Sequence, residues 1–306
     1  ITNVPWMDII GKSVPASDRA QMFAVRRLAG GGVAMLAGAI ISWVLSDRSG
    51  FVFPDNYAIL FVLSGIGTGL SVVAFSRIRE PIQQQKRGKT LPMGEYLKVG
   101  LGMLRDDLNY RRLCILQFLW AFSMMATPFF VPFALTDLGM DESVVGFFVA
   151  VMQFSSIFSN VLWAWVGQKK GNQALLSIGT WFLAFSLFIP LTIRLIPPLE
   201  VTLFAWAGSE GAFDLRVAYY ALTFVFTGFA MSGMFTGRMT YVLDIAPEDR
   251  RPTYTSFMNA AMLPQGVLPI LGGWLVALIS YQNMFIVSLM FVPVAVWMAR
   301  KLKAVK

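Results

Sequence analysis

The chain contains no histidine and only one cysteine among its 306 residues. Histidine is the side chain that most often serves as a general base or a metal ligand near neutral pH, so its absence removes the commonest catalytic and zinc-binding arrangements. The single cysteine, Cys114, excludes a disulfide within the chain. There is no serine or cysteine nucleophile with a base and no buried pair of acids. The sequence therefore predicts a protein that is not an enzyme, with no cofactor and no metal.

Charged residues are scarce as well. Only 14% of the residues are charged and 56% are hydrophobic, which is too apolar for a soluble domain of this size. Eight apolar stretches approach the ~20 residues with which an α-helix crosses a ~30 Å hydrocarbon layer. Because backbone groups in lipid must bond internally, these stretches predict an all-α polytopic membrane protein. The expected spans are 22–46, 56–77, 111–136, 143–167, 174–196, 217–242, 254–280 and 283–299.

The basic residues are confined to alternate gaps between these spans. Of the 25 lysines and arginines, only Arg48, Arg194 and Arg216 fall on the other side. Because basic loops remain in the cytoplasm, the pattern predicts a multi-pass protein of the cytoplasmic (inner) membrane with both ends of this chain in the cytoplasm. No basic stripe follows one soluble face, so the expected partners of these charges are anionic membrane lipids and not nucleic acid.

A short motif occurs twice, each time before a long helix. Residues 14–19 read Val-Pro-Ala-Ser-Asp-Arg and residues 246–250 read Ala-Pro-Glu-Asp-Arg. Proline followed by Asp-Arg is a helix-start signal, and its repetition indicates two homologous halves. Four spans precede the second junction within its half. By symmetry the intact protein is expected to have twelve helices, with the first four upstream of residue 1 and the start of this chain a cut end.

Two six-helix halves joined by a long basic loop resemble the major facilitator superfamily of transporters. Residues 164–171, Ala-Trp-Val-Gly-Gln-Lys-Lys-Gly, are similar to the family signature Gly-x-x-x-Asp-Arg/Lys-x-Gly, with Ala164 replacing the first glycine and Gln168 the acid. Residues 77–81, Arg-Ile-Arg-Glu-Pro, are similar to a motif that often ends the sixth helix. The resemblance implies helices five to twelve of that bundle. Residues 1–77 would end the first half (with the tail of helix four), 78–110 would link the halves, and 111–306 would form the second half.

Two local patterns predict how particular helices pack. Apolar residues recur at helical spacing in the linker, which indicates a short amphipathic helix on the inner leaflet. Gly30, Ala34 and Gly38 are spaced four residues apart, which favours close packing against another helix. The apolar residues of the linker are Met93, Leu97, Leu101, Leu104 and Leu108.

The resemblance implies alternating access, in which the two halves rock about a solute site near the bilayer midplane. It places spans 111–136 and 217–242 along the cavity. Polar and aromatic residues share a helical face in these spans and in 143–167, and two amides lie beside the prolines that break span 254–280. The alternative for each residue is an interhelical hydrogen bond, worth about 0.6–2 kcal/mol. The predicted cavity residues are Gln117, Trp120, Thr127, Gln153, Ser156, Asn160, Tyr220, Thr223, Thr227, Asn259 and Gln265.

A second set of residues lies near the cytoplasmic ends of the helices and is predicted to form the gate. Asp8 and Asp244 are expected close to the helix-start arginines of the two junctions. The alternative is that these charges are helix ends exposed to solvent. The predicted gate residues are Asp8, Arg19, Lys169, Gly171, Asp244 and Arg250.

No charged residue falls in the middle of a predicted span, and charges there are usually functional. We therefore expect a coupling carboxylate on the preceding helices, with Na⁺ coupling and facilitated diffusion as alternatives. The sequence predicts a secondary active transporter of a small organic solute, neutral or lipophilic, coupled to protons and monomeric when full length. Two other interpretations stay open: a non-transporting membrane scaffold or assembly factor on the same fold, and a sodium-coupled sugar symporter.

Overall fold

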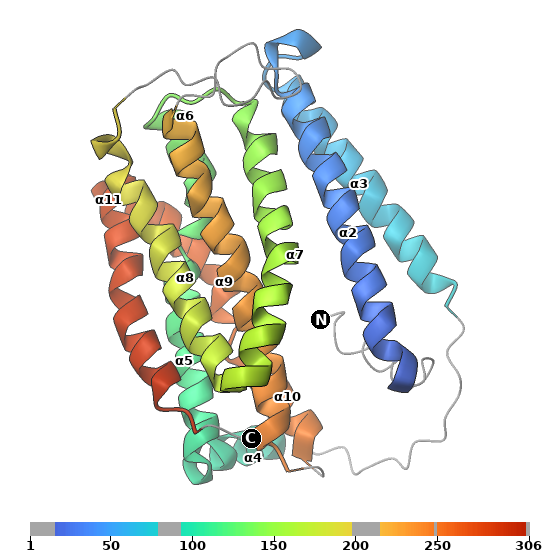
Figure 1. Cartoon of the computed structure of the whole chain (residues 1–306), viewed down its shortest axis with the longest axis vertical. Helices are drawn as coiled ribbons and strands as arrows, with labels where there is room; N and C mark the ends of the chain where they lie inside the picture. The colour runs from blue at the N-terminus through green and yellow to red at the C-terminus, as the bar shows by residue number, and fades with distance from the viewer. Residues whose placement is uncertain (1–15, 79–92, 198–214, 248–249, 304–306) are drawn as a thin grey trace.

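The computed structural model describes residues 16–78, 93–197, 215–247 and 250–303, and all regular secondary structure in this part of the chain is helical. Figure 1 shows a bundle of long helices, with α2 and α3 side by side along one flank. The elements are α2 (Ala16–Val44), η1 (Asp47–Ser49), α3 (Asp55–Ser76), α4 (Met93–Asp106), α5 (Leu108–Met124), η2 (Thr127–Phe129), α6 (Phe130–Thr136), α7 (Val144–Lys170), α8 (Asn172–Thr192), η3 (Ile193–Leu195), α9 (Leu215–Ile245), α10 (Arg251–Ala260) and α11 (Pro264–Arg300).

Six stretches of the described helices are long and apolar enough to cross a membrane, and Ala29–Val44 is a shorter apolar helix. This confirms the predicted class, an all-α polytopic membrane protein. The counts of eight spans in this chain and twelve in the intact protein stay predictions. The six stretches are Asp55–Ser76, Leu108–Thr136, Val144–Lys170, Asn172–Leu195, Leu215–Ile245 and Thr253–Arg300.

The last of these stretches doubles back on itself. Tyr254 packs against Tyr110 at the start of α5, with ring centroids 4.5 Å apart. The carbonyl of Lys301 accepts a 2.6 Å hydrogen bond from Arg112, in the same turn of α5. Both ends of the stretch therefore lie at one end of α5, which a straight helix cannot achieve. The reversal is at Ser280, whose φ of 76° and ψ of 164° are not helical.

One end of the bundle is held together by side chains that reach backbone carbonyls. It is the end at which α7, α9 and α11 finish, and we call it the basic end because Lys169, Lys170 and Arg300 occupy these last turns. The hydroxyl of Tyr110 donates to the carbonyl of Tyr254 at 2.7 Å. This bond and that of Arg112 to Lys301 join helix ends that are distant in sequence. They hold together the end of the bundle near which the candidate site lies.

The helix α2 packs against α7 through small residues. A Cβ placed on Gly38 would lie 2.9 Å from the carbonyl oxygen of Gly146, and one on Gly146 would overlap the backbone of α2. Beside them, the hydroxyl of Ser42 donates to the carbonyl of Ser143 at 2.8 Å. The two backbones approach closely only because these residues have little or no side chain.

The predicted small-residue seam is confirmed at Gly38, whereas Gly30 meets no other helix in the described part of the chain. A Cβ on Gly30 would have nothing within 4 Å, whereas one on Gly31 would meet Ile157 of α7. Over several turns the 3.6-residue period of a helix rotates a strict four-residue repeat away from its partner. The contact face consequently runs through Gly31, Gly38 and Ser42.

The predicted linker helix is present as α4. Its Gly100 lies against the ring of Phe257 in α10, and Met103 is buried while Leu101 is 66% exposed. One face of α4 thus packs under the basic end of the bundle. The contact of the other face with the inner leaflet stays a prediction.

Candidate functional site

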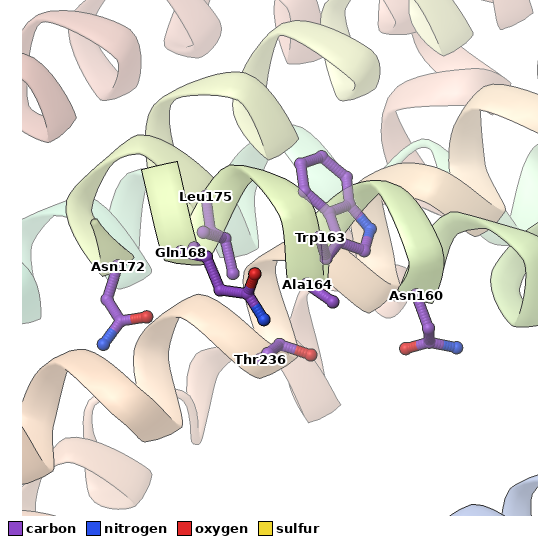
Figure 2. A pocket seen from close by; sticks show the side chains of 8 residues that line it. Asn160, Trp163, Ala164, Gln168, Asn172, Leu175 and Thr236 are labelled. Atoms are coloured by element: carbon purple, nitrogen blue, oxygen red, sulfur yellow. The ribbon is translucent and has the colours of Figure 1, made fainter. Parts of the chain in front are cut away.

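A hollow of about 420 Å³ opens between α7, α8 and α9 near the basic end. Three of its lining side chains are carboxamides and none is charged. Figure 2 shows the amide of Gln168, from α7, and the hydroxyl of Thr236, from α9, directed into the same space. The lining residues are Asn160, Trp163, Ala164, Gly167, Gln168, Asn172, Leu175 and Thr236.

Two polar atoms in the wall of the hollow are buried without a partner. Trp163 is only 1% exposed, and its Nε1 has no hydrogen-bond acceptor among the described residues. The same holds for the hydroxyl of Thr236, which has neither donor nor acceptor in that part of the chain. Because buried polar atoms are nearly always bonded, these two are exceptions, although neither is exposed to the hollow in this conformation. They offer one N–H donor and one hydroxyl that can donate or accept.

Asn160 lines the hollow at the end farther from the basic end, and hydrogen bonds from α7 and α9 hold its amide in place. Its Oδ1 accepts a 3.1 Å hydrogen bond from Ser232 of α9. Its Nδ2 donates to the carbonyl of Ser156, one turn earlier in α7, at 2.9 Å. The amide therefore has a fixed orientation, as a solute-contacting group requires.

The segment 164–171 forms the floor of the hollow. Gly171 joins α7 to α8 with φ 79° and ψ 168°, a conformation that only glycine adopts readily. Its N–H donates to the carbonyl of Gly167 at 3.1 Å and completes the end of α7. This sharp turn lets α8 begin at once, with Asn172 donating to Asp244 of α9 at 2.6 Å.

Residues 113–305 match the family model described as Major Facilitator Superfamily. The chain belongs to this superfamily. The match begins in the second turn of α5 and includes every residue that lines the hollow. It makes the protein a member of a family of membrane transporters rather than of enzymes. Among curated proteins, none matches the chain significantly.

Of the eleven residues predicted for the transporter cavity, only Asn160 lines the hollow. Gln117 and Trp120 are buried on α5, and neither the amide of Gln117 nor Nε1 of Trp120 has a hydrogen-bond partner among the described residues. The buried hydroxyl of Thr223 on α9 is in the same condition. These three keep the unpaired polar atoms expected of solute-contacting residues, and their role stays a prediction.

Three other predicted residues bond to the protein backbone. Tyr220 donates to the carbonyl of Phe130 at 2.6 Å. Thr127 and Thr227 each donate within their own segment, at 2.7 Å, to carbonyls three or four residues earlier. Only the bond of Tyr220, from α9 to α6, is the interhelical alternative that the sequence left open, because the two threonine bonds are local. Gln153 and Ser156 lie on α7, half-buried.

The predicted break in span 254–280 is confirmed at Pro264 but not at Pro269, which lies inside α11. Helix α10 ends at Ala260 and α11 begins at Pro264, because the proline has no N–H with which to continue the ladder and suits the first turn of a new helix. Asn259 and Gln265 flank the break and are half-buried. Between them, the N–H of Met262 donates to the carbonyl of Asn259 at 3.1 Å in a tight turn.

Only some of the predicted gate residues are among those that the structure describes. Asp8 lies outside the described residues, and Arg19 belongs to α2 but its side chain lies outside them too. Lys169 lies over the ring of Trp165, at 5.1 Å. Arg250 is exposed at the N-cap of α10. Asp244 accepts a hydrogen bond from Asn172, the residue after Gly171, and the gating role of the set stays a prediction.

Sequence reasoning missed Arg238. The sequence counted Arg238 among the cytoplasmic charges. In the structure it lies inside α9, which continues for seven more residues to Ile245. Its Nε is buried without a partner among the described residues, and its Nη1 donates to the sulfur of Met262 in the helix break. The signal was present in the sequence, because the residues that follow Arg238 extend the helix through Tyr241 and Val242, both buried.

Proposed function

We propose that the protein is a secondary active transporter that moves a small organic solute across the cytoplasmic membrane by alternating access. We propose further that it has twelve helices, eight of them in this chain. The superfamily match supports transport. The observation that carries solute binding is the hollow, whose wall holds two buried polar atoms with no partner among the described residues.

The position of the hollow supports an opening between the two halves. Gly146 and Ile157 of α7 face α2, the helix of the first half. Asn160, Ala164 and Gln168 continue the same face of α7 toward the basic end, at helical spacing, and there they line the hollow. No described side chain of α2 lines the hollow, so in this part of the chain the face that α2 covers at one end of α7 is open at the other. Closure of α2 over this open segment would exchange access between the two sides of the membrane.

We propose proton coupling through a carboxylate that lies outside the spans described here. Within them, the acidic residues Asp55 and Asp244 both lie at helix ends. A transport cycle that binds a proton in the membrane needs an acid that is partly desolvated. Uptake that persists when a protonophore collapses the proton gradient would count against this part of the proposal.

Alternating access can be tested without knowing the solute. In the native gene product, Cys114, which is buried, is replaced by serine and Ala164 by cysteine. An impermeant maleimide is then applied to inside-out vesicles with and without an imposed proton gradient. For a transporter, labelling of the Ala164→Cys site should change when the gradient shifts the population of open states. The matched control is Leu195→Cys, 79% exposed at the opposite end of the bundle, which should not respond from this side.

A non-transporting scaffold predicts the opposite result. Its hollow would be labelled at one rate whatever the gradient, because a scaffold has no reason to exchange between two open states. Constant labelling of Ala164→Cys, in a protein whose folding is verified by its unfolding temperature, would therefore overturn the transport proposal in favour of the scaffold.

A further inference from the structure

Arg238 lies within α9, and its charged side chain does not line the hollow. Its guanidinium lies over the ring of Phe235, 5.3 Å from the centroid, and its Nη1 meets the sulfur of Met262. No carboxylate of the described residues forms an ion pair with it, and its buried Nε has no acceptor there. Arg238 is half-buried, and removing part of a guanidinium from water is costly unless an anion accompanies it.

The side chain of Arg238 is directed at the break between α10 and α11. A helix that is interrupted inside a membrane span is a frequent place for ligand binding in transporters. The N-terminal end of α11, at Pro264, follows this break, where the N–H groups of Gln265 and Gly266 donate to the carbonyls of Met262 and Leu263. Asn259 and Gln265 flank it with amide groups. Through its contact with Met262, the arginine thus brings one full positive charge to a segment flanked by two neutral amides.

We propose that Arg238 and the break form a site for a single anionic group, a carboxylate or a phosphodiester, and that the transported solute is a lipophilic monoanion. The assignment rests on the proposed transport function. The planar fork of a guanidinium matches the oxygens of either group. The solute body is apolar because the remaining neighbours of the guanidinium, Phe235 and Met262, offer an aromatic face and a polarisable thioether. A dianion would exceed the single arginine charge.

The test is thermal unfolding of the purified native gene product in detergent, with sodium benzoate as the probe. Benzamide, its neutral analogue, is the ligand control, and sodium chloride keeps the ionic strength equal. Benzoate should raise the unfolding temperature and benzamide should not. The shift should vanish in Arg238→Gln and survive in Arg194→Gln, whose arginine is exposed and pairs with Asp137 at 3.8 Å. Arg238→Lys, which keeps the charge without the fork, should retain part of the shift and guards against a failure of Arg238→Gln to fold.

A second measurement separates a solute from a lipid as the source of the anion. The protein is placed in nanodiscs of phosphatidylcholine with or without phosphatidylglycerol. Stabilisation by phosphatidylglycerol that requires Arg238, with no effect of benzoate, would keep the anion site but overturn its assignment to the solute. A benzoate shift of equal size in wild type and Arg238→Gln, or no Arg238-dependent effect of either anion, would overturn the site itself. The labelling of Ala164→Cys is independent of these results, so failure of the site and failure of transport can be told apart.

Discussion

The side-chain amide of Asn172 donates a hydrogen bond of 2.6 Å to Oδ2 of Asp244. Asn172 is the first residue of α8, directly after the glycine that ends the signature segment, and Asp244 lies in the last turn of α9. The bond therefore ties the floor of the hollow to the helix that forms its other wall. It also gives Asp244, a predicted gate residue, a neutral partner on a neighbouring helix.

Replacing Asn172 by alanine should affect the hollow more than the overall stability. A hydrogen bond to a charged group contributes about 1.5–3 kcal/mol when enclosed, and we expect roughly 1 kcal/mol or less here because water reaches this exposed pair. Maleimide labelling of Ala164→Cys should become faster, since α9 is no longer tied to α8. The matched control is Asn283→Ala, another exposed asparagine, whose amide donates to Ile279 at 2.7 Å. Equal labelling in both variants would contradict a gating role.

Gly171 should not tolerate a side chain. Its φ of 79° and ψ of 168° lie in a region that costs other residues on the order of 1–3 kcal/mol. Gly171→Ala is therefore expected to lower the free energy of unfolding by that amount. The control is Gly167→Ala, one turn earlier, where the new Cβ would meet its nearest atom at 3.5 Å, an ordinary contact. Helix propensity predicts that Gly167→Ala is neutral or stabilising by up to about 1 kcal/mol. Denaturant unfolding of both variants measures these free energies. Equal losses of unfolding free energy in the two variants would show that a side chain at residue 171 does not strain the turn.

Hydropathy and charge were sufficient to predict the helical membrane fold, because both act over about twenty residues at a time. The helix break at Pro264 was also predictable, since proline removes a backbone donor wherever it occurs in a helix. The close contact of Gly38 followed from residue size. The register of that contact did not, because Gly30 and Gly31 differ by a rotation that depends on the partner helix.

The candidate site was less accessible to the sequence than the fold. Helical spacing shows which residues share a face, but it does not show what that face touches. Tyr220 and Gln117 were predicted on the same grounds, yet Tyr220 is bonded to a backbone carbonyl and Gln117 has no partner among the described residues. Arg238 was missed because it was counted among the cytoplasmic charges although it lies within span 217–242, whereas a long side chain can remain inside a helix beside a broken neighbour.

The hydroxyl of Thr236 should be unnecessary for folding. It is buried without a partner among the described residues, and such a group costs about 1–3 kcal/mol relative to a bonded one. Thr236→Val keeps the shape of the side chain and should raise the free energy of unfolding, by up to about 1 kcal/mol, in the absence of solute. Thr180→Val is the matched control, because Thr180 is equally helical but donates to the carbonyl of Leu176 at 2.7 Å, so this variant should lose stability. A loss in Thr236→Val as large as in Thr180→Val would mean that the hydroxyl is bonded in the native state.

The contact between α2 and α7 should depend on the absence of a side chain at Gly146. A Cβ there would overlap the carbonyl oxygen of Gly38 and the backbone of Ser42, so the helices must separate. Overpacking of this kind costs typically about 1–3 kcal/mol. Gly30→Ala, in the same helix pair but with nothing within 4 Å of the new Cβ, should be neutral or slightly stabilising. The unfolding temperatures of the two variants test this prediction. Similar values would mean that α2 and α7 can move apart without lowering the stability of the protein.

Tyr220 provides a test of the packing alternative for a predicted cavity residue. Its side chain is completely buried, and its hydroxyl donates to the carbonyl of Phe130 at 2.6 Å, joining α9 to α6. Tyr220→Phe keeps the ring and removes the bond, leaving the carbonyl without this donor, so we expect a loss of about 1–3 kcal/mol in the free energy of unfolding. Tyr281→Phe is the control, since Tyr281 packs by its ring against Phe133, with centroids 5.8 Å apart, and loses no hydrogen bond within the described residues. Because the hydroxyl of Tyr220 is already committed to the backbone, Tyr220→Phe should leave the benzoate-induced rise in unfolding temperature unchanged. A stable Tyr220→Phe variant with a reduced benzoate shift would instead indicate that Tyr220 contacts the solute. Its bond to the carbonyl of Phe130 would then belong to the unliganded protein only.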